Sequence, residues 1–103
     1  MFADLETVDC PANKTVPEGS NFTLRCSANA DDDSRALISW EKDGEALNTS
    51  EPGMMISGTD SPSQLSILGA TPTDAGLYTC IAKNNNSGVT KACPEARVTV
   101  QCK

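Results

Sequence analysis

The chain has 103 residues, 38% hydrophobic and 21% charged, which suits one globular domain and excludes a disordered tail. No apolar run approaches the ~20 residues that cross a bilayer. A net charge of −6 repels nucleic acid and anionic lipid, and the lack of histidine removes the usual general base and the commonest zinc ligand.

Apolar and polar residues alternate in short runs separated by Gly, Pro, Asn and Asp, and this pattern predicts an all-β sandwich. The first predicted strand spans 20–28, with Phe22, Leu24, Cys26 and Ala28 on its buried face. In chain order, the others are 37–42, a short edge strand at 45–47, 54–57, 64–68, 77–83 and 89–101. Because proline cannot donate a ladder hydrogen bond, Pro94 predicts an edge or a bulge within the last strand.

Five cysteines and four glycosylation motifs indicate the compartment. Without histidine or a close C-x-x-C pair, the cysteines do not resemble a metal or redox cluster, so we interpret them as disulfide partners. The N-x-Ser/Thr motifs begin at Asn13, Asn21, Asn48 and Asn85. Together these features predict an extracellular glycoprotein, and we favour a cell-surface ectodomain over a secreted protein.

The predicted domain boundaries follow from the pattern of strands. We expect 1–7 to be the start of an excised segment or an upstream linker. The single domain would span 8–101, and 102–103 would begin a downstream linker.

Nothing in the sequence predicts catalysis. The serines and threonines have no histidine partner, and the G-x-S-x-G, S-x-x-K and phosphate-binding glycine motifs are absent. The acidic run Asp31-Asp32-Asp33 lacks the spacing of a calcium-binding loop, so we interpret it as a solvated loop. We therefore predict that the protein is not an enzyme and that it has no cofactor and no metal ligands.

Four separated elements resemble an immunoglobulin domain of the intermediate (I-set) type, and the resemblance covers roughly 8–100. They are Cys26, Trp40 in Ile-Ser-Trp-Glu-Lys-Asp-Gly, Leu65-Ser-Ile67, and Asp74-Ala-Gly-Leu-Tyr-Thr-Cys80. The resemblance implies an immunoglobulin-like β-sandwich of two antiparallel sheets with Greek-key connections. It also implies a Cys26–Cys80 bridge between the sheets, with Trp40 packed against it and Tyr78 as the tyrosine corner.

Three cysteines then remain, and the implied arrangement favours one pairing. In that arrangement the segment that precedes the turn at 18–19 (A′ in the family's lettering) runs parallel to the last strand. Cys10 precedes the turn at 18–19 by about eight residues, roughly 25 Å of extended chain, which places it beside the early part of the last strand. We therefore favour Cys10–Cys93, with Cys102 unpaired within the domain or bonded to a neighbour. The competing pair is Cys10–Cys102.

With catalysis excluded, binding remains, and the resemblance leaves several kinds of binding open. The favoured reading is a module of an adhesion or recognition protein that contacts an immunoglobulin-like domain of the same or a different chain. The alternatives are a ligand-binding or spacer domain of a signalling receptor or secreted multidomain protein. Neither nucleic acid nor direct membrane insertion is expected.

The glycosylation motifs predict which face is free. Asn21 alternates with core residues, so its glycan would project from the middle of one sheet and make that sheet a poor docking surface. The opposite sheet, which contains strands 37–42, 77–83 and 89–101 (C, F and G in the family's lettering), has no central motif. Its outward residues form the predicted partner-binding face: Leu37, Ser39, Glu41, Thr79, Ile81 and Lys83.

Overall fold

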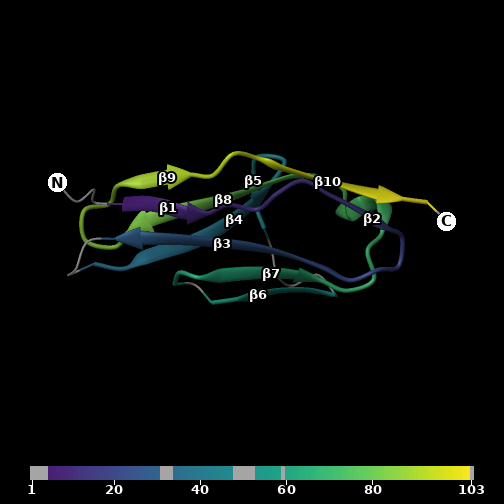
Figure 1. Ribbon diagram of the computed structural model, residues 1–103, viewed down its shortest axis with the longest axis horizontal. Helices are drawn as coiled ribbons and strands as arrows, with labels where there is room; N and C mark the ends of the chain where they lie inside the picture. The colour runs from purple at the N-terminus through teal and green to yellow at the C-terminus, as the bar shows by residue number, and fades with distance from the viewer. Residues whose placement is uncertain (1–4, 31–33, 48–52, 59, 103) are drawn as a thin grey trace.

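Two β-sheets pack face to face in the computed structural model, which describes residues 5–30, 34–47, 53–58 and 60–102 (Figure 1). The four-stranded sheet has the order β1-β3-β7-β6, formed by Leu5–Asp9, Phe22–Ala30, Ser63–Ile67 and Met54–Ser57. The six-stranded sheet has the order β2-β10-β8-β4-β5, formed by Lys14–Pro17, Ala96–Gln101, Gly76–Asn84, Ala36–Lys42 and Glu45–Ala46. Its sixth strand, β9 (Thr90–Ala92), pairs with β8. The all-β sandwich predicted from the sequence is therefore confirmed.

The alternation of side chains accounts for the layers. In β3 and β4, every second residue is buried between the sheets, as in half-buried strands of a sandwich. The predicted strands are all present, and apart from the interruption of the last one their ends lie within two residues of the predicted positions. In the described part of the chain, no helix is long and apolar enough to span a bilayer.

The N-terminal strand begins earlier than the predicted domain boundary at residue 8. Leu5 pairs with Ala30 of β3 and is only 1% exposed, so this residue contributes to the core rather than to a linker. The register of the β1–β3 pair shifts between Thr7 and Asp9. This irregularity interrupts the period-two pattern, which explains why the sequence did not reveal the strand.

The last strand is divided as Pro94 predicted. Ala92 lies opposite Ile81 and Ala96 lies opposite Tyr78, so four steps along this strand match three steps along β8. The segment 93–95 therefore contains one extra residue. The bulge separates β9 from β10.

The turn between β4 and β5 fixes the edge of the six-stranded sheet. Lys42 pairs with Glu45, so the loop consists of Asp43 and Gly44, which have φ angles of 53° and 85°. Two positive φ angles are typical of a type I′ hairpin turn, in which glycine is favoured. The Asp43 carboxylate also accepts a hydrogen bond from the Leu77 backbone N–H at 3.0 Å.

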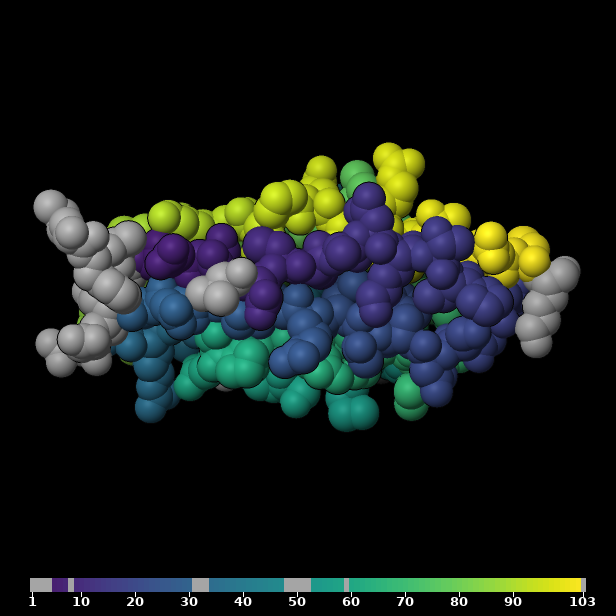
Figure 2. Space-filling view, viewed as in Figure 1, coloured from purple at the N-terminus to yellow at the C-terminus, as the bar shows by residue number. Residues whose placement is uncertain are grey.

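The domain is elongated, with principal extents of 50 × 23 × 19 Å. The start of β1 and the end of β10 lie at opposite ends of the long axis (Figure 1). In the space-filling view of Figure 2, the N-terminal strands run between β9 and β10 on one side and β3 on the other. Because β1 belongs to one sheet and β2 to the other, residues 10–13 cross between the sheets.

Candidate protein-binding face and disulfide core

The buried disulfide joins the two sheets at their centre. Cys26 of β3 is bonded to Cys80 of β8 with a Cα–Cα distance of 6.4 Å, as the family resemblance implied. Trp40 lies opposite Cys80 in the ladder and is 3% exposed. Its indole N–H donates to the Ser63 hydroxyl at 3.0 Å, and that hydroxyl donates to the Gly58 carbonyl at 2.9 Å. Ser63 was not singled out from the sequence, although it satisfies the one polar atom of the buried indole.

The tyrosine corner is present at the start of β8. The Tyr78 hydroxyl donates to the Asp74 carbonyl oxygen at 2.5 Å, while its ring is fully buried. Asp74 ends a short 3₁₀ helix, Pro72–Asp74, and its carboxylate accepts from the Thr71 backbone N–H at 2.8 Å. The hydrogen bond therefore fixes β8 to the turn that precedes it.

Replacing Tyr78 with phenylalanine should lower the free energy of unfolding by about 1–2 kcal/mol, because it removes this hydrogen bond and leaves the ring packing intact. Chemical denaturation of the two proteins measures the difference. Thr79→Val, on the outward side of the same strand, is the control and should change stability by less than about 0.5 kcal/mol. Equal stability of Tyr78→Phe and the wild type would contradict a structural role for the corner.

The second disulfide joins the crossing segment to the bulge. Cys10 is bonded to Cys93 with a Cα–Cα distance of 5.6 Å, which is the pairing that the sequence analysis favoured over Cys10–Cys102. Cys102 is exposed and is not in a disulfide. The bond holds β1 and the start of β2 against the last strand, so it fastens the edge of the sandwich.

Three sulfur atoms gather in the core. The Sγ atoms of Cys26, Cys80 and Cys93 all lie within 4.8 Å of one another. Each is part of a disulfide, and a metal would need a thiolate. The cluster is therefore a pair of touching disulfides and not a metal site. The acidic run 31–33 lies outside the described residues.

The predicted partner-binding residues share the outer surface of the six-stranded sheet. Their ladder pairs place them in adjacent rows: Leu37 opposite Lys83, Ser39 opposite Ile81, and Glu41 opposite Thr79. The intervening residues of both strands point into the core. Two strands that are distant in sequence thus present one continuous surface at the centre of the sheet.

The two apolar residues of this surface are only partly exposed to solvent. Leu37 and Ile81 are both half-buried. A lysine opposite Leu37 can cover it with its aliphatic stem. Among the described residues, the large hydrophobic side chains that are exposed lie elsewhere: Met55, Leu68 and Val89.

The described glycosylation motifs have exposed asparagines whose amide oxygens accept backbone hydrogen bonds. Asn13 accepts from the Arg97 N–H at 2.8 Å, Asn21 from Gly69 at 2.9 Å, and Asn85 from Arg35 at 2.8 Å. An N-linked glycan is attached through the amide nitrogen, the other branch of the side chain. These hydrogen bonds are therefore compatible with glycosylation. Asn48 lies outside the described residues.

The expected position of Asn21 in the middle of a sheet was wrong. The β3–β7 ladder begins at Phe22, which pairs with Ile67, and Asn21 instead contacts the turn at Gly69. It therefore lies at the end of the four-stranded sheet. The outer face of that sheet is more open than the sequence suggested, and the exposed Met55 projects from it.

Asn84 organises the loop that carries Asn85. Its side chain is fully buried, and its amide oxygen accepts from the backbone N–H groups of Asn86 and Ser87 at 2.8 and 3.0 Å. This is the turn geometry that asparagine side chains favour, and the polar run 84–88 was its sequence signal. The loop is thereby held at the end of β8.

An open pocket of about 530 Å³ lies at the sheet edge between β4 and β6. None of the described residues that line it is charged. The lining residues are Ile38, Ser39, Trp40, Ala46, Leu47, Met54, Met55 and Ile56.

Comparison with known proteins gives consistent matches. A family model described as "Immunoglobulin domain" matches residues 12–92. The chain is 34% identical over 100 residues to the rat "Tyrosine-protein kinase receptor TYRO3", covering 96% of this chain and 11% of that protein. It is 33% identical over 81 residues to "Muscle M-line assembly protein unc-89" of Caenorhabditis elegans, covering 79% of this chain and 1% of that protein.

A solved structure, that of titin domains Z1Z2 in complex with telethonin, matches with a TM-score of 0.83 and 26% identity. The match covers all of this chain and 50% of the titin chain. Compared with these two curated relatives, the chain is a small fraction of the whole protein.

Proposed function

Because this chain belongs to the immunoglobulin domain family, we propose that it is an extracellular protein-binding module of a cell-surface adhesion or recognition protein. The family consists of non-catalytic binding modules, and the chain is not an enzyme. Its partner would be another protein, with an immunoglobulin-like domain of the same or a different chain as the favoured class. The solved titin relative is itself in a complex with a second protein.

The binding surface in this proposal is the outer face of the β8 and β4 strands. The observation that supports it most directly is the pairing of Ser39 with Ile81 and Leu37 with Lys83, which places apolar and polar groups together on one side of the sheet. Among the described motifs, Asn85 lies in the turn after β8, Asn21 at the end of the other sheet, and Asn13 beside Arg97 of β10. None of these asparagines lies among the six residues of the face, so glycans on them would leave its centre free.

The extracellular location rests on the disulfides. One bond includes the exposed Cys10, which a reducing cytosol would attack. The relatives include both a receptor kinase and a muscle assembly protein, so similarity alone does not fix the compartment. One disulfide lies in the core and the other fastens the edge, and two such bonds favour an oxidising, extracellular compartment. A cell-surface ectodomain is the favoured form.

An Ile81→Asp variant tests the face. A desolvated carboxylate at the centre of the contact is costly, so we expect it to abolish association. The assays are sedimentation equilibrium of the glycosylated domain with itself and surface binding to a panel of immunoglobulin-family ectodomains. The thermal midpoint of the variant should stay within about 4 °C of the wild type.

Ser66→Asp is the matched control, because Ser66 projects from the outer face of the opposite sheet, paired with Met55. It should bind as the wild type does. Binding that survives Ile81→Asp, or that is lost only in Ser66→Asp, would remove the proposed face. A domain that is monomeric and binds nothing in the panel would overturn the adhesion role in favour of the spacer alternative, and binding to a soluble ligand alone would favour the receptor alternative.

A further inference from the structure

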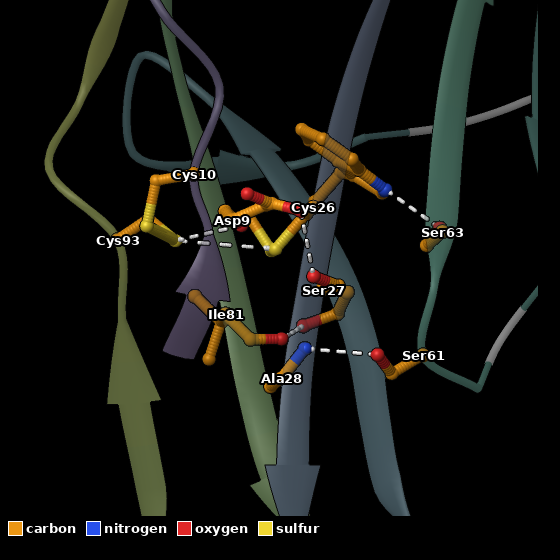
Figure 3. Close-up of a disulfide and its surroundings, with 12 residues drawn as sticks. Asp9, Cys10, Cys26, Ser27, Ala28, Ser61, Ser63, Ile81 and Cys93 are labelled. Carbon is orange, nitrogen blue, oxygen red and sulfur yellow. Dashed lines mark hydrogen bonds between the residues drawn. A yellow bond between two sulfur atoms is a disulfide. The ribbon is translucent and has the colours of Figure 1, made fainter. Parts of the chain in front are cut away.

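The two disulfides of this domain touch each other. The Cys93 sulfur lies 3.9 Å from the Cys26 sulfur, and Figure 3 shows the two bonds side by side in the core. Cys93 is also the neighbour of Cys80, because its backbone N–H donates to the Cys80 carbonyl at 2.9 Å. Cys80 of β8 and Cys93 of the bulge beside it therefore both face Cys26 of the other sheet.

The two ends of the outer disulfide differ in their access to solvent. Cys10 is an exposed residue in the segment that crosses between the sheets, whereas Cys93 is 4% exposed. Thiol–disulfide exchange begins with attack of a thiolate on one sulfur, and access decides which sulfur is attacked. Of the two residues, Cys10 is the one open to solvent, so we expect a thiol in solution to attack its sulfur, with Cys93 as the leaving group.

We propose that Cys10 is a site of S-thiolation by small external thiols of the glutathione class, and that the released Cys93 then exchanges with the Cys26–Cys80 bond. In the first step, the external thiolate forms a bond with Cys10 Sγ, and the Cys10–Cys93 bond breaks to leave a Cys93 thiolate. In the second step, that thiolate forms a bond with Cys26 Sγ, and the Cys26–Cys80 bond breaks. Cys80 leaves as a thiolate and takes a proton from the solvent.

No net oxidation or reduction takes place in this sequence. Two disulfides and one external thiol become two disulfides and one protein thiol, so the only co-reactant is the external thiol. The products are a mixed disulfide at Cys10, a Cys26–Cys93 bond and a free Cys80.

The second step is expected to be fast because the reacting sulfur atoms are already close together. The Cys26 sulfur is the immediate neighbour of Cys93 Sγ, and in-line attack would require the released Cys93 side chain to rotate about its Cα–Cβ bond. An attack within one molecule at contact distance competes well with an attack by a thiol from solution. Cys26 and Cys80 are 1% and 0% exposed, so few external thiols reach the inner bond directly.

The sequence makes the products easy to distinguish. A lysine or arginine separates every pair of cysteines, so trypsin places each one on its own peptide: 1–14, 26–35, 43–83, 92–97 and 98–103. A Cys102→Ser background removes the exposed free thiol and prevents links between molecules.

The experiment treats the folded Cys102→Ser protein with glutathione, blocks thiols with an alkylating agent in denaturant, and maps the tryptic peptides over time. We expect glutathione on peptide 1–14, a link between 26–35 and 92–97, and the alkylating agent on peptide 43–83. The matched control also carries Cys10→Ser and Cys93→Ser. In that control the Cys26–Cys80 link should disappear at least about tenfold more slowly.

Three outcomes would overturn the proposal. The first is an intact Cys26–Cys80 link with Cys93 alkylated, which would mean that the released thiol does not exchange. The second is loss of the inner link at the same rate in the control, which would mean direct attack from solution. The third is a protein that acquires no glutathione at Cys10.

Discussion

The double variant Cys26→Ala/Cys80→Ala should lose about 4 kcal/mol of its free energy of unfolding. The two cysteines are 54 residues apart, and a cross-link that closes a loop of this size stabilises by about that amount in the chain-entropy model. A domain of this size has only ~5–15 kcal/mol in total. The thermal midpoint should therefore fall by roughly 15–30 °C, which calorimetry and urea denaturation both measure.

The matched control is Cys10→Ala/Cys93→Ala, whose bond spans 83 residues. Chain entropy alone predicts a similar loss, about 4.5 kcal/mol. Any greater loss in the Cys26/Cys80 variant would measure the packing of the inner bond against Trp40. A loss of less than about 1 kcal/mol in the Cys26/Cys80 variant would contradict the view that this bond holds the sheets together.

The Leu5→Ala variant should lose about 2–3 kcal/mol, although Leu5 lies outside the domain boundary that the sequence predicted. Its side chain is 1% exposed and belongs to the central hydrophobic cluster, so truncation removes buried apolar surface and leaves a cavity. Its place on an edge strand near the chain end favours the lower part of the usual range for such variants. Urea denaturation of the two proteins measures the loss.

Glu6→Ala is the control, because Glu6 is the next residue of β1 and is exposed. It should change stability by less than about 0.5 kcal/mol. If Leu5→Ala is as stable as Glu6→Ala, the first residues of β1 do not contribute to the core and the domain begins later than the structure indicates.

Much of the architecture could be predicted because its signals are local. Each half-buried strand from Phe22 onward alternates clearly enough to show its period, and Pro94 marked the interruption of the last strand. Trp40 and Tyr78 occupy the positions that the family resemblance implied, each with a hydrogen-bond partner. Such positions depend on short spacings along the chain, which a sequence displays directly.

The parts that the sequence did not predict depend on partners that are distant in the chain. The β1 strand escaped notice because a register shift interrupts its alternation. Asn21 continues the alternation of β3, but the ladder with β7 begins only at the next residue, Phe22, because β7 ends at its partner Ile67. Where a strand stops is decided by its neighbour, and the neighbour is known only from the fold.

The sequence predicted which side chains point outward on the candidate face but not how exposed they are. Alternation alone places Leu37 and Ile81 on the outside, which the ladder pairs bear out. Their half-burial depends on cross-strand neighbours such as Lys83, whose identity follows from the register between β4 and β8. A shift of that register by one residue would exchange the outer and inner sets of side chains.

The Cys10–Cys93 bond determines how the domain would transmit a pulling force. Tension between the start of β1 and the end of β10 acts along the long axis, because these points lie at opposite ends of the molecule (Figure 1). The shortest covalent path between them passes through Cys10, crosses the sulfur pair and continues from Cys93, which is 83 positions further along the chain. The residues between the two cysteines are bypassed, and at ~3.4 Å per residue about 280 Å of extended chain is withheld from stretching. With this bond closed, the domain acts as a short tether of nearly fixed length.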